Sequence, residues 1–116
     1  MALDAPANPV SSITPDVCTS DRSITITWDA PDAGTAEIEG YSVFWDEQEK
    51  TIPGENIIVT EPQTTTCLAN GSNHYIHIRA KDNDGNWSET LDYGPFCIEN
   101  KDKIVLKFIT TSRRNF

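Results

Sequence analysis

Long apolar runs, basic residues and export signals are what this sequence has least of. No segment approaches the roughly 20 consecutive apolar residues of a membrane-spanning helix, so we expect no membrane insertion. The N-terminal decapeptide MALDAPANPV has neither the basic start nor the apolar centre of a signal peptide. Residues 1–100 carry four basic and 17 acidic side chains, hence a net charge of −13. The negative charge of residues 1–100 would repel the phosphate backbone of a nucleic acid, so we expect no nucleic-acid partner.

Motifs that mark catalytic or metal sites are also missing. The sequence has no Gly-x-Ser-x-Gly elbow, phosphate-binding loop or paired-histidine motif, so we expect no enzyme activity and no cofactor. His74 and His77 fall on opposite faces of an extended strand, so they cannot bind one metal ion side by side. Cys18, Cys67 and Cys97 are too widely spaced for a Cys-x-x-Cys metal site. One disulfide at most forms within the chain, which leaves a third cysteine free or paired between molecules.

The clearest signal that is present runs from residue 74 to residue 88, HYIHIRAKDNDGNWS. Ile76 and Ile78 alternate with polar residues, which is the period of a β-strand with one buried face. The tetrapeptide NDGN at residues 83–86 favours a tight turn. We therefore predict a strand that ends in a reversal, with residues 91–99 as its hairpin partner.

Further short strands are predicted before this one, and turn-rich segments separate them. They span residues 10–19, with a break at Pro15, and residues 23–28, 40–46, 57–60 and 64–68. No segment shows a convincing helical period. About seven short strands at regular spacing predict an all-β sandwich.

These residues together resemble a fibronectin type III domain. The pattern consists of Trp28 with Pro31 three residues on, Gly40-Tyr41-x-Val43, Leu68, Ile76-x-Ile78-x-Ala80, and Gly85. The chain is most similar to a variety from bacterial secreted proteins, which carries GYSxxWD, LADGSNHYxHxRAxDNAGNWS and GPFYID in this order. The corresponding segments here are residues 40–46, 68–88 and 94–99. The resemblance implies a seven-stranded Greek-key β-sandwich of the fibronectin type III and immunoglobulin-like kind. It also implies a module of surface or exported proteins, hence an extracellular or cell-surface location.

The resemblance divides the chain into three parts. Residues 1–8 are expected to be a linker, 9–99 the domain, and 100–116 a basic, apolar tail. The tail carries a net charge of +4 and an apolar run from 104 to 109. It is either the start of a following module or a strand supplied to the sheet edge of a neighbouring molecule, and thus a means of self-association.

Strand parity selects the expected core, and the family pattern adds one unusual member. The core list is Ile24, Ile26, Trp28, Tyr41, Val43, Leu68, His74, Ile76 and Ile78. Members of the family usually place a tyrosine six residues after the leucine, where this chain has His74. We therefore expect His74 to be buried and hydrogen-bonded to the backbone of the loop at residues 69–73.

The outer sheet face is the first candidate binding surface. Opposite parity puts Tyr75, His77 and Arg79 on that face, and Phe44 should lie beside them. Exposed aromatic rings with an arginine suit a protein or glycan contact. The alternative is ordinary cross-strand pairing, which stiffens a sheet.

Two further features are weighed against structural explanations. Trp87 is expected to pack over the hairpin base, with sugar stacking as the alternative. The alternating Asp82, Asp84 and Asn86 suggest calcium ligands, but their spacing does not fit an EF-hand loop, so a polar turn is favoured. Cys18 and Cys67 are the expected disulfide partners, because the predicted topology places both at one end of the sandwich.

Three functions follow as hypotheses. The leading one is a non-enzymatic extracellular module for adhesion or spacing in a bacterial surface or secreted protein, with a protein or glycan ligand not yet identified. The second is a self-assembling, filament-like subunit that uses the tail as a strand. The third is a carbohydrate-binding accessory module of a secreted hydrolase.

Overall fold

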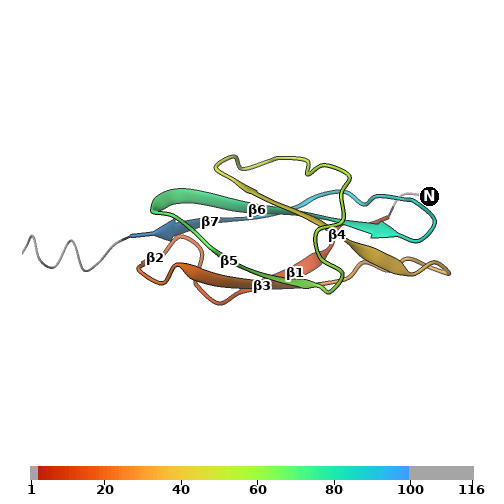
Figure 1. Cartoon of the computed structure of the whole chain (residues 1–116), viewed down its shortest axis with the longest axis horizontal. Coiled ribbons are helices and arrows are strands. Elements are labelled where there is room, and N and C mark those ends of the chain that lie inside the picture. Colours follow the sequence, from red (N-terminus) through yellow and green to blue (C-terminus); the bar gives the residue numbers. More distant parts are fainter. Residues whose placement is uncertain (1–2, 100–116) are drawn as a thin grey trace, which may run out of the picture.

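Two β-sheets packed face to face make up the computed structural model, which describes residues 3–99 (Figure 1). The strands are β1 (Ala7–Ser11), β2 (Cys18–Thr19), β3 (Ser23–Asp29), β4 (Ile38–Asp46), β5 (Gln63–Cys67), β6 (Gly71–Asp82) and β7 (Leu91–Ile98). The smaller sheet has the order β1-β3-β5, and the larger has β2-β7-β6-β4. The predicted all-β, seven-stranded sandwich is therefore confirmed. No helix long and apolar enough to cross a membrane occurs between residues 3 and 99.

The core lies between the sheets and follows the alternation of the sequence. In β3, Ile24, Ile26 and Trp28 are buried, and the residues between them are not. Tyr41 packs edge-on against Trp28, with ring centroids 5.2 Å apart. Leu68, Ile76 and Ile78 are buried as predicted, and Val43 is partly buried against the same cluster.

Three segments differ from their predicted organisation. Residues 10–19 form two separate strands and not one strand with a break at Pro15: β1 ends at Ser11, and β2 begins at Cys18 after Asp16 has adopted a φ of 66°. The strand predicted at 57–60 is reduced to one bridge between Val59 and Tyr41. At the N-terminus, Leu3 lies in the segment predicted as a linker, yet it is buried and pairs with Ser88. The tail at 100–116 lies outside the described residues.

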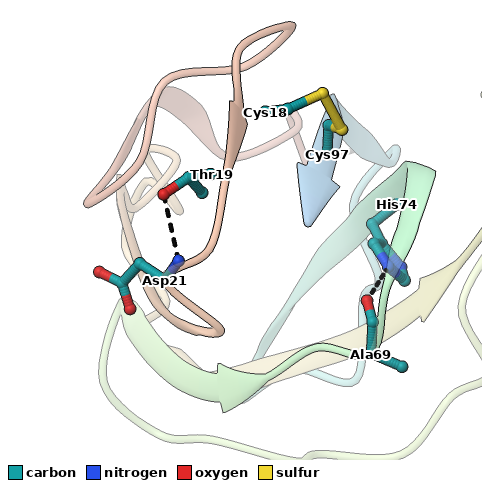
Figure 2. The surroundings of a disulfide bond; sticks show 6 residues. All are labelled: Cys18, Thr19, Asp21, Ala69, His74 and Cys97. Atoms are coloured by element: carbon teal, nitrogen blue, oxygen red, sulfur yellow. Dashed lines mark hydrogen bonds between the residues drawn. A yellow bond between two sulfur atoms is a disulfide. The ribbon is translucent and has the colours of Figure 1, made fainter. Parts of the chain in front are cut away.

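The disulfide joins Cys18 to Cys97, so the predicted Cys18–Cys67 pairing is wrong (Figure 2). The reason is that β2 belongs to the larger sheet, where it pairs in parallel with β7 and sets Cys18 directly beside Cys97. Cys67 instead pairs with Ser23 in the smaller sheet and is a free, exposed thiol. Cys97 is itself buried.

His74 makes the predicted hydrogen bond but is less buried than expected. Its Nε2 lies 2.8 Å from the carbonyl oxygen of Ala69, as Figure 2 shows. The ring is only half-buried. A Cβ at Gly71 would come within 3.0 Å of Nε2, so the close approach of the ring depends on this glycine.

Candidate binding groove

The outer face of the larger sheet carries the predicted row, but not as an open surface. The β4–β6 register places Phe44 opposite His77 and Asp46 opposite Tyr75, so all four belong to one face. Phe44 is 47% exposed. His77 is fully buried, which contradicts its expected exposure, and Arg79 is half-buried.

The connection from β4 to β5 covers this face and explains the difference. In Figure 1 the yellow-green connection runs on the side of the larger sheet that faces away from the smaller one. The Ser42 hydroxyl donates to the Gly54 carbonyl at 2.6 Å. Arg79 donates to the Pro53 carbonyl at 3.2 Å, and Pro53 is buried. The connection is therefore bound to two outward-facing strand residues.

His77 bridges two carboxylates on neighbouring strands. Its Nε2 lies 2.7 Å from Asp46 on β4, and its Nδ1 lies 2.6 Å from Asp92 on β7. Each ring nitrogen therefore lies at hydrogen-bonding distance from one carboxylate oxygen, and the ring links β6 to both of its neighbouring strands. The two acids contact opposite nitrogens, so this cluster does not converge on one metal ion. Half of this cluster could be anticipated from the sequence. The predicted hairpin pairs residues 91–99 with the strand that contains His77, and its register sets Asp92 opposite His77.

Asp46 also holds the start of the covering connection. Its carboxylate accepts from the Thr51 hydroxyl at 2.5 Å and from the Gln48 backbone N–H at 3.0 Å. Burial by itself would raise the pKa of Asp46, but these two bonds and the His77 ring together lower it below its usual value. The ionised carboxylate is therefore part of what orders residues 46–51.

A groove of about 630 Å³ remains between the covering connection and the segment after the β6 turn. We call it the Trp87 groove. Its lining residues are Lys50, Thr51, Ile52, Arg79, Trp87, Ser88, Glu89, Thr90 and Asp92. A hollow of about 280 Å³ shares Lys50, Thr90 and Asp92 with it and extends to Tyr75. Arg79 and Trp87 therefore line the groove, Tyr75 lines the adjoining hollow, and Phe44 lies outside both linings.

Trp87 is held at the wall of this groove by its neighbours. It bridges to Lys81 on β6, at the base of the β6–β7 connection. The Arg79 guanidinium lies over the indole, 5.3 Å from the ring centroid, and its Nε donates to the Ser88 carbonyl at 3.0 Å. Ser88 is buried, and its hydroxyl accepts from the Ala80 N–H at 2.8 Å. A half-buried indole on so many fixed contacts presents a preorganised surface.

The charges of the groove stand out against an acidic domain. Lys50 and Arg79 are two of the four basic residues among the 97 that the structure describes, 3–99. Within those residues Lys50 makes no ion pair, whereas Arg79 lies 4.0 Å from Glu55. Glu89 and Asp92 supply acceptors nearby, so the groove offers charges of both signs beside an indole.

Hydrogen bonds to the Asp82 carboxylate organise the turn after β6. Asp82 is buried, and its Oδ1 accepts from the backbone N–H groups of Asp84 and Asn86 at 3.0 and 2.9 Å. The Asn86 backbone bond is the main reason that the pKa of Asp82 is lowered, although burial opposes it. The carboxylate is thus already satisfied by the turn itself.

One cluster of metal-binding side-chain types occurs within residues 3–99, and it does not form a site. Cys18, Cys97 and Glu99 bring their ligand atoms within 4.8 Å of one another. Both sulfur atoms belong to the disulfide, so neither is a thiolate that can bind a metal.

Comparison with known proteins supports the fold at the level of a family. No curated protein matches the chain. The family model described as fibronectin type III domain matches residues 8–92, and these residues include all of β1 except Ala7, β2 to β6 and the groove wall at Trp87. Domains of this kind are generally non-catalytic structural or binding modules and are typically extracellular. The chain belongs to the fibronectin type III family.

Proposed function

We propose that this domain is a non-enzymatic extracellular adhesion module of a bacterial surface or secreted protein, and that it binds a saccharide in the Trp87 groove. The observation that carries the proposal is the groove itself, where one indole and several hydrogen-bonding side chains line a single depression. Of the predicted contact surface, the proposed site keeps Arg79 and does not use Phe44 or the buried His77. Bacterial origin rests on the resemblance of residues 40–46, 68–88 and 94–99.

Saccharide chemistry matches the lining. A pyranose ring has C–H faces that pack on an aromatic ring, and hydroxyls around its rim that both donate and accept. Trp87 supplies the ring, and Lys50 supplies a donor without an ion-pair partner in residues 3–99. Asp92 uses Oδ1 for His77, which leaves Oδ2 to accept from a hydroxyl. A few fixed polar groups beside an aromatic surface are typical of small-ligand sites.

A glycan array probed with the dye-labelled chain tests the proposal. We expect binding to at least one glycan class, and a loss of at least tenfold in signal for Trp87→Ala. Phe44→Ala is the matched control, because it removes an exposed ring from the same sheet face outside the groove. An array without binding, or equal losses for the two variants, overturns the saccharide proposal and favours a spacer role.

A further inference from the structure

The free edge of β5 differs from the other three sheet edges. In β1 the pairing shifts register between Ala7 and Val10, and Pro9 lies in that interval. β2 has only two residues, and β4 is covered at Tyr41 by Val59. β5, with the sequence QTTTC, has no charge, no proline and no register shift. Proteins normally protect edges with such features, because an unprotected edge pairs with other chains.

Backbone groups along this edge point away from the sheet. The Trp28 N–H donates to the Pro62 carbonyl, and the Leu68 N–H donates to the Arg22 carbonyl. In an antiparallel ladder these bonds alternate, so Thr64 and Thr66 bond to β3. The N–H and C=O groups of Thr65 and Cys67 then face outward, and no partner for them occurs among residues 3–99. The edge therefore offers the backbone N–H and C=O groups of two alternate residues, Thr65 and Cys67, to an added strand.

We propose that the β5 edge binds residues 104–109 of a second copy of this chain as an added strand. That segment, IVLKFI, contains neither glycine nor proline and is rich in β-forming residues. In an extended strand, alternate side chains point to the same face, so Ile104, Leu106 and Phe108 would share one face. If the segment is added to the β5 edge, this apolar row is removed from water. Residues 101–116 carry +4 against −13 for residues 1–100, so approach of the tail to a second copy is electrostatically favourable.

This proposal is independent of the saccharide site. β5 belongs to the smaller sheet, whereas the strand residues of the Trp87 groove belong to the larger one. The variant Trp87→Ala is therefore expected to leave association unchanged. Failure of glycan binding and failure of self-association are separate results.

Sedimentation velocity of the full chain at about 100 µM and low salt is the test. All proteins carry Cys67→Ser, so that no disulfide between copies contributes. We expect the parent to associate and Thr65→Pro to be monomeric, because proline removes the N–H that faces the edge. Thr65→Val is the matched control: it keeps the N–H and is expected to associate as the parent does.

Two variants of opposite charge, Thr65→Lys and Thr65→Glu, keep the proposal testable if Thr65→Pro does not fold. Thr65→Lys keeps the N–H but repels a basic strand, so association is expected to weaken at least tenfold relative to Thr65→Glu. The gap between these two variants is expected to narrow at about 0.5 M salt, where exposed charges are screened. A monomeric parent, or a lysine variant that associates as tightly as the glutamate variant, overturns the proposal.

Discussion

At the scale of single residues, His77 shows what strand parity predicts and what it misses. Parity placed His77 on the outer face correctly, since it lies opposite Phe44 and Asp92. It could not predict burial, because the covering connection has no periodic pattern that assigns it to that face. The buried ring is tolerated because both nitrogens are hydrogen-bonded to acids.

Replacing His77 tests this cluster. His77→Leu removes both hydrogen bonds and leaves Asp46 and Asp92 as like charges beside a new apolar side chain. We expect a loss of about 2–4 kcal/mol in urea unfolding at pH 7, less than for a fully buried pair because both acids are partly exposed. Phe44→Leu, in the same row, is expected to cost under about 1 kcal/mol. Equal costs would show that the cluster contributes no specific stability.

At the scale of elements, the connections decide where polar groups end up. The turn after β6 is built around the Asp82 carboxylate, and the connection after β4 is built around Asp46. Both carboxyl groups have lowered pKa values, for the reasons given above. The turn was recognisable in sequence from NDGN, whereas the role of Asp46 depends on its distance to Thr51 in the folded chain.

Lowered pKa values predict acid sensitivity with a defined sign. A carboxyl group whose pKa is lower in the folded state stabilises the fold above its unfolded pKa of about 3.9. That contribution is lost as the pH falls through the folded pKa. The urea midpoint of the parent is therefore expected to decline below about pH 4.

The variant Asp82→Asn separates the turn from the rest of this effect. We expect it to be less stable than the parent at pH 7 and to converge with the parent at acid pH. The measurement is a series of urea melts between about pH 7 and pH 2.5. If the unfolding free energies of the two proteins change in parallel with pH, the ionised Asp82 carboxylate does not stabilise the fold.

The disulfide acts at the same scale, because it ties the two-residue β2 to β7. It joins cysteines 79 positions apart, and closing a loop of that size restricts the unfolded chain strongly. The double variant Cys18→Ala/Cys97→Ala is expected to lose about 2–5 kcal/mol of unfolding free energy. Cys67→Ser, at an exposed site, is expected to lose under about 0.5 kcal/mol. A larger loss for Cys67→Ser, or a Cys67 cross-link in non-reducing peptide maps, would contradict the assignment.

At the scale of the whole molecule, the fold was far more predictable than the site. Alternation alone located β3, most of β6 and the buried face that holds Ile24, Trp28 and Ile76. The groove combines Lys50, Arg79, Trp87 and Asp92 from segments that are apart in sequence. Its shape depends on how the β4–β5 connection lies on the sheet, and that is set by individual hydrogen bonds and not by periodicity. The path of β2, which determined the disulfide, was unpredictable for the same reason.

Binding in the Trp87 groove can be measured by titrating the isotope-labelled chain with the glycan that gives the strongest array signal. Two-dimensional ¹H–¹⁵N spectra report on every backbone amide and on the indole N–H of Trp87. We expect saturable shifts at Trp87, at Arg79 and at residues 50–52 and 89–92, with the β3 and β5 amides unchanged. Shifts centred on Phe44 or on the smaller sheet, with the Trp87 indole unmoved, would contradict it.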